Sequence, residues 1–436
     1  MKQSPAETNS ENKRRTFLKQ LLTGSVATLT FPAFANPDST EDPSLSISSK
    51  FSPMGDALDE RYWEMVKKQF TVPPNLMMVN AANLCPSPYF INDLVAATMK
   101  DLGKDVSFQF RRHFAEKRAI SLEKLSQFIG VAKEEIGIVR NATEGNSIIV
   151  NGLGFKPGDE IITWEQNHPS NGIAWEQRAK REGFIVKKIA VPAVPKSPDE
   201  LLAPFAKVIT SKTRLITFSH ISNTSGIALP AKEICQLAKS KRILTLVDGA
   251  QSLGMMDLNL KVMGCDFYTA STHKWLMGPL ENGILYVSKD HVEHLWPNVI
   301  SAGWKDSSTT VDEKLCVLGQ RNETTPFVLP ETLEFHQSIG KKIIEQRVRK
   351  LNTYLKEQVQ AKLPQTTFVS PLSPDMSGGI VSVNFPGKQP QELYQKLYEV
   401  HGIACSATGG VRLSPHIYNT LEDMDKIVAA LASLTA

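Results

Sequence analysis

A carboxylate and an amine in the middle of the chain, Asp248 and Lys274, have the surroundings of reactive groups. Asp248 ends the apolar run I-L-T-L-V at 243–247, and a charge at the end of a buried strand needs a partner of opposite sign. Lys274 follows a second apolar run, F-Y-T-A at 267–270, and is flanked by a histidine and a tryptophan. Such neighbours would partly desolvate the amine and lower its pKa, as a lysine that bonds covalently to a carbonyl carbon requires. A solvated lysine is the ordinary alternative. The pair indicates a cofactor site.

Alternating strands and helices predict the layer that positions these two residues. Strand-length apolar runs lie at 136–140, 160–164, 184–191, 214–219 and 243–248. Helix-length amphipathic segments lie between them, at 144–153, 171–182, 201–208 and 231–240. This alternation is typical of an α/β fold, in which a mostly parallel sheet is covered by helices and carries its functional groups at the carboxyl ends of the strands.

The pattern of strands and helices changes beyond residue 330. This change predicts a large cofactor-binding domain at 56–330, followed in the chain by a small α+β domain at 331–436. We expect its elements to be a long charged helix at 332–363, a strand at 379–385, a helix at 389–400, a short strand pair around 403–406 and 411–414, and a last helix at 421–434.

The first 35 residues resemble a twin-arginine signal peptide. Arg14 and Arg15 are followed by an uncharged segment at 21–31 and by A-F-A at 33–35, the small-residue pattern of a cleavage site. The uncharged segment is shorter than the roughly 20 apolar residues of a membrane span. We therefore expect export to the periplasm by the twin-arginine machinery, with a linker at 36–55 rich in Pro, Ser and Asp. Retention of the leader as an anchor is the alternative.

Composition excludes several classes of protein. The leader holds five Lys or Arg against two Glu, so it accounts for three of the four net positive charges among 436 residues. The nearly neutral remainder lacks the basic surface that nucleic-acid binding requires. The five cysteines are widely spaced and form no C-x-x-C pair, so we expect no metal site and small buried side chains.

Several separated motifs together resemble the class V aminotransferase family of pyridoxal-phosphate enzymes, which includes isopenicillin N epimerase-like proteins and cysteine desulfurases. They are D-G-A-Q at 248–251, C-D-F-Y at 265–268 and S-x-H-K at 271–274, and the similarity extends over about residues 80–434. The resemblance implies the fold of fold-type I pyridoxal-phosphate transferases, with pyridoxal 5′-phosphate as cofactor.

The resemblance also assigns roles to individual residues. Lys274 would bind the cofactor covalently, and Asp248 would pair with its pyridine nitrogen. His168, in N-H-P-S-N, would stack on the ring as a catalytic histidine. The remaining cofactor contacts would be Gln251 and Asn223 to the ring 3-oxygen and, for the phosphate, Thr143 and Glu144 in the turn A-T-E-G with Ser271 and His273.

The substrate implied by the resemblance is an amino acid. Arg412, in G-G-V-R-L-S, matches the arginine that binds the substrate carboxylate, for which a planar guanidinium is suited. The segment G-Q-R-N at 319–322 resembles a loop that reaches the phosphate of the partner subunit in a homodimer.

One departure from the family pattern narrows the reaction. In cysteine desulfurases a loop with the nucleophilic cysteine lies before the carboxylate-binding arginine, whereas only residues 406–411 separate Cys405 from Arg412. We therefore expect transamination or isopenicillin N epimerase-type epimerisation at the substrate Cα. A C–S lyase is the alternative, and a non-catalytic binding protein on the same fold is a weaker one. A nicotinamide dehydrogenase is disfavoured because G-L-G at 152–154 lacks the third glycine and opens no helix.

Overall fold

The structure is a computed structural model that describes residues 59–435. The predicted leader and linker, at 1–35 and 36–55, lie outside the described residues. The described residues form one compact unit, and the domain boundary expected near residue 330 stays a prediction. None of the helices within 59–435 has the length and apolar content needed to cross a bilayer.

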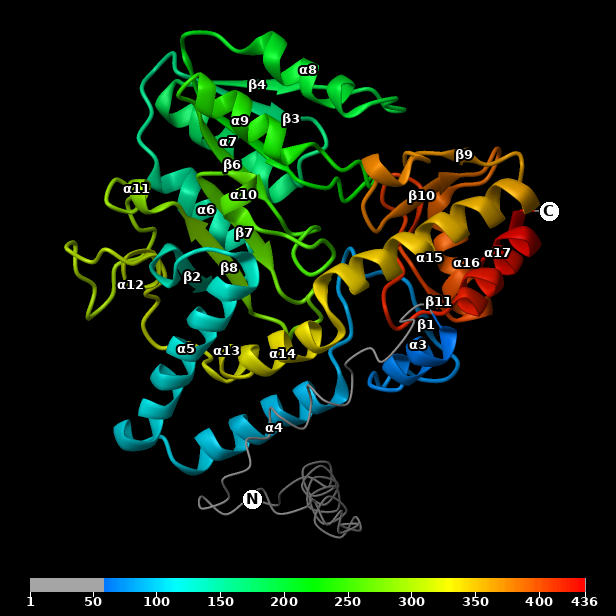
Figure 1. The fold of residues 1–436 in the computed structure, drawn as a ribbon, viewed down its shortest axis with the longest axis horizontal. Helices are drawn as coiled ribbons and strands as arrows, with labels where there is room; N and C mark the ends of the chain where they lie inside the picture. Colours follow the sequence, from blue (N-terminus) through cyan, green and yellow to red (C-terminus); the bar gives the residue numbers. More distant parts are fainter. Residues whose placement is uncertain (1–58, 436) are drawn as a thin grey trace, which may run out of the picture. The chain divides into compact units, whose positions relative to one another are not determined.

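Seven strands form the central sheet, in the order β2-β8-β7-β6-β5-β3-β4 (Figure 1). Neighbouring strands run parallel except at β8, which is antiparallel to both β2 and β7. The carboxyl ends of β2, β3, β5, β6 and β7 therefore meet at one edge of the sheet. The strands are β2 (Ile136–Val139), β3 (Glu160–Trp164), β4 (Ile185–Ile189), β5 (Thr213–Ser219), β6 (Leu244–Asp248), β7 (Phe267–Ser271) and β8 (Gly283–Val287).

Helices cover both faces of this sheet because side chains alternate along each strand. Ile162 and Val247 point into one core, whereas their neighbours Ile161 and Leu246 point into the other. The first core is closed by α5 (Phe108–Ile129), α8 (Pro198–Val208), α9 (Ala231–Ser240), α10 (Leu260–Met263) and α14 (Leu329–Ile339). The second is closed by α6 (Ala142–Gly152), α7 (Pro169–Glu182), α11 (Lys289–Val292) and α12 (Val311–Leu315). The predicted α/β class with a mostly parallel sheet is confirmed.

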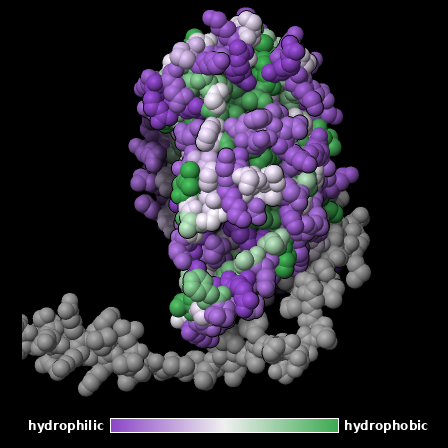
Figure 2. Space-filling view, turned by 90° about the vertical axis from the view of Figure 1, so that its left-hand side faces the viewer, coloured by the Kyte–Doolittle hydropathy of each residue, from purple (hydrophilic) through white to green (hydrophobic). Residues whose placement is uncertain are grey.

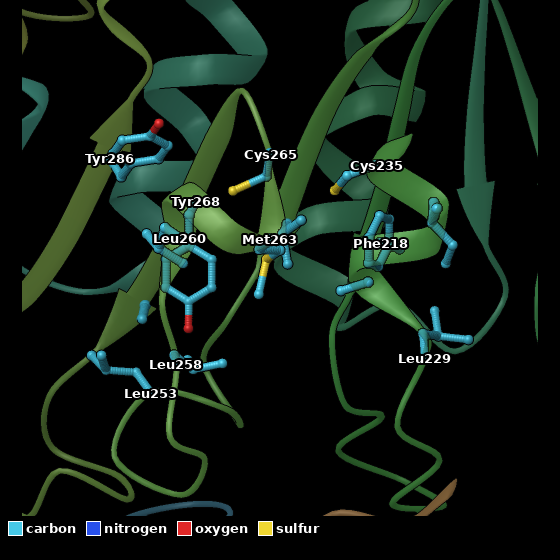
Figure 3. Packing of buried hydrophobic residues seen from close by; sticks show 14 of the residues in the cluster. Phe218, Leu229, Cys235, Leu253, Leu258, Leu260, Met263, Cys265, Tyr268 and Tyr286 are labelled. Atoms are coloured by element: carbon cyan, nitrogen blue, oxygen red, sulfur yellow. The ribbon is translucent and has the colours of Figure 1, made fainter. Parts of the chain in front are cut away.

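Three of the cysteines belong to these two cores, Cys235 and Cys265 to the first and Cys316 to the second. Figure 3 shows Cys235 and Cys265 among Phe218, Met263 and Tyr268 in the first core. All five cysteines are free and buried, so they pack as small hydrophobic side chains, as expected.

The C-terminal part of the chain has its own core. Three antiparallel strands, β9 (Thr367–Phe368), β10 (Val381–Asn384) and β12 (Val411–Leu413), form a sheet in the order β12-β10-β9. They pack with α15 (Lys341–Lys362), α16 (Pro390–His401) and α17 (Leu421–Thr435). Beside them β1 (Met77–Met78) pairs in parallel with β11 (Ile403–Ala404), so an N-terminal strand is part of this C-terminal core.

Two predictions for the C-terminal part are wrong. The helix expected at 332–363 is two helices, because Gly340 has φ +100° between α14 and α15, a conformation that glycine adopts at least cost. The short strand pair expected around 403–406 and 411–414 is reduced to one bridge, between Ser406 and Arg412. β11 pairs instead with β1, and β12 with β10.

Three helices before β2 were not predicted. They are α3 (Glu60–Lys67), α4 (Tyr89–Lys104) and α5, and α5 is capped by the Ser107 hydroxyl, which accepts a hydrogen bond from the Phe110 N–H. The remaining short elements are η1 (Lys133–Glu135), α13 (Thr324–Phe327) and η2 (Pro374–Met376).

The face that carries α11 and α12 is mostly hydrophilic, with hydrophobic residues in small separate areas (Figure 2). Scattered exposed hydrophobic side chains of this kind are ordinary on a protein surface.

Candidate active site

Asp248 is the last residue of β6, and its side chain is buried. Its Oδ1 accepts a hydrogen bond from the Ala250 N–H over 3.1 Å, and its Oδ2 accepts one from Asn146 Nδ2 over 3.0 Å. Both donors are neutral, and within residues 59–435 Asp248 takes part in no ion pair. Asp248 is therefore a buried, hydrogen-bonded carboxylate that can still bind a cation.

The residue after Asp248 must be glycine. A Cβ on Gly249 would lie 1.9 Å from Cζ of Tyr268, a buried side chain of β7 that Figure 3 shows from close by. Tyr268 also donates a hydrogen bond to the Gly249 carbonyl over 3.4 Å. The D-G-A-Q motif thus turns tightly over the neighbouring strand, which fixes Asp248 at the edge of the sheet.

Lys274 lies in a tight turn after β7. The Met277 N–H donates to the Lys274 carbonyl over 2.9 Å, and Met277 has φ +61°, a left-handed conformation that costs about 1 kcal/mol for a residue with a side chain. Lys274 Nζ has no hydrogen bond or ion pair to another described residue. Burial lowers the pKa of its amine; the Asp248 charge opposes this shift and the Arg412 charge adds to it. The direction of this shift agrees with the desolvated amine expected from the sequence, and the reactivity of Lys274 stays a prediction.

The N-terminus of α6 lies beside the end of β7. The Ser271 hydroxyl accepts a hydrogen bond from the Ala142 N–H over 2.9 Å, and Asn141 Oδ1 accepts one from the Glu144 N–H over 3.0 Å. Thr143 is exposed and lines a cavity of about 520 Å³. Ser271 and Thr143 are thus brought to one helix N-terminus, where N–H groups and the helix dipole favour an anion.

Glu144 has a different set of contacts. Its carboxylate accepts hydrogen bonds from the Arg140 N–H over 2.6 Å and from the Arg140 guanidinium over 3.0 Å. The Glu144 side chain therefore fixes the turn that precedes α6.

Two histidines flank the site. His168 caps the N-terminus of α7, and its N–H donates to the Ser219 hydroxyl over 3.1 Å. Burial lowers the pKa of His168, the charges of Lys274 and Arg412 lower it further, and the charge of Asp248 raises it. These four side chains are therefore near enough for their charges to interact.

His273 is the second histidine. Burial and the Lys274 charge lower its pKa to about 4, so its imidazole is neutral at physiological pH. Its Nδ1 is buried and has no hydrogen-bond partner within the described part of the chain.

Gln251 and Asn223 hold the site together through different atoms. Gln251 is buried; its Nε2 donates to the Ala82 carbonyl over 2.8 Å, and its Oε1 accepts from Trp275 Nε1 over 2.8 Å. One N–H of Nε2 is left for another acceptor. Asn223 offers its backbone carbonyl, which accepts from Arg412 Nη1 over 2.8 Å.

Arg412 lies in the middle of β12 and is only 4% exposed. Its Nη2 donates to Asn80 Oδ1 over 3.0 Å, and its Nε is buried without a partner in the described residues. Burial lowers its pKa to about 10, and no carboxylate from 59–435 pairs with it. A buried guanidinium with neutral partners is suited to bind a carboxylate.

Two site residues have no counterpart in the sequence analysis. Asn146, fully buried in α6, donates to Asp248 and accepts from the Thr269 hydroxyl over 2.6 Å. A polar residue on the apolar face of an amphipathic helix is the signal that could have revealed it. Asn80 lies before β2, in a segment with no comparable signal.

The side chains fit pyridoxal phosphate, the cofactor that the resemblance implies. Asp248 offers a carboxylate without a cationic partner, and Lys274 offers an amine without a hydrogen bond among the described residues. The unpartnered Nδ1 of His273 and the hydroxyls of Ser271 and Thr143 are suited to the polar groups of the cofactor. No group of three or more histidine, cysteine, aspartate or glutamate side chains in 59–435 is arranged to hold a metal ion.

Comparisons with curated proteins agree with this chemistry. Isopenicillin N epimerase of Streptomyces clavuligerus is 28% identical over 392 residues, which cover 86% of this chain and 98% of that protein. A probable cysteine desulfurase of Pyrococcus abyssi is 29% identical over 344 residues, which cover 73% of this chain and 83% of that protein.

The fold is shared with a solved structure of the apo form of cysteine desulfurase from Thermococcus onnurineus. That structure has a TM-score of 0.76 and 23% identity, and the match covers 85% of this chain and 98% of that one. The model of the family Aminotransferase class-V matches residues 99–427. Because this match extends over most of the sequence, the chain belongs to the class V aminotransferases, a family of pyridoxal-phosphate enzymes.

Proposed function

We propose that this protein acts at the Cα of an amino acid, by transamination or by epimerisation of the isopenicillin N epimerase type. One observation carries the proposal: an amine, a carboxylate and a guanidinium, at Lys274, Asp248 and Arg412, are not ion-paired within the described residues and lie near enough for their charges to interact. The similarity to isopenicillin N epimerase, which extends over 98% of that protein, supports it.

Each charged group has one task in this proposal. Arg412 binds the substrate carboxylate and so fixes the direction of the Cα bonds. Lys274, once its amine is free, is the base that takes the Cα proton, and burial, which lowers the pKa of that amine, favours this role. Asp248 keeps the pyridine nitrogen protonated. The bound cofactor supplies an electron sink for the Cα bonds.

The other predicted residues complete the site in the same proposal. Thr143, Ser271 and His273 bind the phosphate at the N-terminus of α6. Gln251 uses its remaining N–H, and Asn223 its side chain, for the ring oxygen, and His168 stacks on the ring.

A desulfurase mechanism is disfavoured by Cys405. This thiol is 3% exposed, and burial raises its pKa to about 12, so it is protonated at neutral pH. Residues 406–411 form the short connection to Arg412, which the bridge between Ser406 and Arg412 holds closed. The thiol therefore lacks the exposure and the charge of a sulfur-accepting nucleophile.

The absorbance spectrum of the reconstituted protein tests the central assignment. Wild type should show the visible band of a lysine-bound cofactor, and Lys274→Ala should not. A wild type that stays colourless after incubation with pyridoxal phosphate would contradict the proposal and favour a non-catalytic binding protein.

A panel of L-amino acids then separates the reactions. Pyridoxamine phosphate with an α-keto acid identifies transamination, and a D-amino acid identifies epimerisation. Released thiol or sulfide would identify the C–S lyase instead.

We further propose that the enzyme is a homodimer. A cavity of about 420 Å³ is lined by Arg111, Arg118, Gln320 and Arg321, which include part of the 319–322 loop. Two exposed hydrophobic side chains support a covered surface here: Val106, which lines this cavity, and Phe108. Light scattering after size-exclusion chromatography should give twice the chain mass, and a monomer with full activity would contradict this proposal.

We also propose that the protein is exported by the twin-arginine machinery. The paired Arg14 and Arg15 support this proposal. Cell fractionation of wild type and of a variant with both arginines replaced by lysine tests it. Equal periplasmic amounts of the two would contradict it.

A further inference from the structure

The segment Asn80–Cys85 crosses the active site, although it lies before the part of the chain that matches the family model. Asn80 accepts from Arg412 Nη2 over 3.0 Å, the Ala82 carbonyl accepts from Gln251 over 2.8 Å, and the Cys85 N–H donates to the His273 carbonyl over 2.9 Å. One short segment thus connects the arginine side of the site with the lysine side.

The backbone at Asn80 is firmly held. It forms a parallel bridge with Ser414, two residues beyond Arg412. The Ser414 N–H donates to the Val79 carbonyl over 2.7 Å, and the Ala81 N–H donates to the Ser414 carbonyl over 3.0 Å. The backbone at Asn80 is therefore fixed to the backbone at Ser414. As a result, the Asn80 side chain has a defined position relative to the Arg412 guanidinium.

The acceptors around Arg412 are neutral. Nη1 donates to the Asn223 carbonyl and Nη2 to the Asn80 carboxamide oxygen, on two different segments of the chain. Each Nη nitrogen has a second N–H, and Nε has its own. The two neutral acceptors therefore hold the guanidinium plane in place while leaving both its positive charge and three N–H groups for a ligand.

We infer that Asn80 is a positioning residue that orients Arg412 for the substrate carboxylate without neutralising its charge. This inference rests on the proposed function, in which Arg412 binds that carboxylate. It explains why an amide is suitable here: an aspartate of the same shape would form an ion pair with Arg412 and compete with the substrate.

Binding of propionate, a carboxylate without an amino group, tests the inference. Calorimetry gives the dissociation constant of propionate for wild type, Asn80→Ala, Asn80→Asp and Arg412→Gln. It is run on the cofactor-loaded enzyme and on the apoprotein, so the result does not depend on turnover. We expect Asn80→Asp to weaken binding roughly 10-fold to 100-fold, the range of a charge-assisted hydrogen bond, and Asn80→Ala to weaken it less. A purely structural role predicts the reverse order, because aspartate preserves the shape of the side chain and alanine does not.

Asn75→Asp is the matched control. It adds the same charge at an exposed asparagine just before β1. It should bind propionate as wild type does. If Asn75→Asp and Asn80→Asp bind propionate with equal affinity while Arg412→Gln does not bind it, the inference is overturned and the proposed function stays intact. No binding to wild type would overturn both. A thermal melt of each variant confirms that it is folded.

Discussion

Asn146 Nδ2 donates a hydrogen bond to Asp248 Oδ2 over 3.0 Å, so the helix that begins at the anion site also holds the acid at the end of β6. The same carboxamide accepts from the Thr269 hydroxyl of β7 over 2.6 Å. One buried side chain therefore fixes α6 against two strands of the sheet.

We expect Asn146→Ala to lower the free energy of unfolding by about 2 kcal/mol, because it leaves a buried carboxylate oxygen and a buried hydroxyl without a partner. The affinity for pyridoxal phosphate should fall as well. Urea unfolding and cofactor titration measure the two effects. Ser147→Ala, next to it on the same helix, should change stability by less than about 0.5 kcal/mol. Equal effects of the two substitutions would show that the Asn146 hydrogen bonds do not matter.

Gly249→Ala should destabilise the protein by about 3 kcal/mol or more, since the new Cβ would lie 1.9 Å from the buried Tyr268 ring. Gly103→Ala is the control, because no atom lies within 4 Å of a Cβ at that position in α4. There alanine should be neutral or slightly stabilising, as it favours the helix. Thermal unfolding measures the stability of both variants. A Gly249→Ala protein as stable as wild type would refute the steric argument.

Acid should destabilise the protein through its buried histidines. Burial lowers the pKa of His336 from 6.5 to about 4. Below pH 6.5 the unfolded chain binds a proton that the folded protein does not bind until about pH 4, so stability is lost as pH falls through this window, by about 3 kcal/mol for one such histidine. His220 and His273 should add to the loss, since their pKa values are also lowered to about 4.

Between pH 6.5 and 4, unfolding of wild type takes up close to one proton at His336. His336→Gln should remove this uptake and so make the unfolding free energy less dependent on pH. His294→Gln, which alters an exposed histidine, should leave the slope unchanged. Chemical denaturation at several pH values measures both, and an unchanged slope in His336→Gln would be the contrary result.

Cys405→Ala should keep most of the turnover of wild type on its amino acid substrate, because the Cys405 thiol is buried and protonated. Cys235→Ala is the control. It removes a buried thiol from the first core of the large sheet and leaves a cavity of the same size. Turnover and sulfide release from L-cysteine are the measurements. Selective loss of sulfide release in Cys405→Ala, with the cofactor band intact, would point to a sulfur-accepting thiol.

Much of the sheet could be predicted from the sequence because most of its strands are short, largely apolar and buried, as at 136–139. The placement of Asp248 and Lys274 followed from the same rule, since both come at or just after strand ends. Residues 89–129 escaped prediction because α5 is polar along much of its length and exposes Phe108.

The break at Gly340 and the role of Asn80 have a common cause. A single glycine inside a charged helical pattern does not reveal whether its φ is positive, and a single asparagine does not reveal its partner. Asn80 meets Arg412 through a strand pairing between distant parts of the chain, which no local pattern encodes.

That pairing determines when the site can be completed during synthesis. Asn80 leaves the ribosome 332 residues before Arg412, and β1 has no partner until β11 has been made. Contacts of such long sequence separation form late, after the local units have folded. The large sheet, with Asp248 and Lys274 at its edge, can therefore assemble first, and the arginine end of the site is the last part of the catalytic centre to be built.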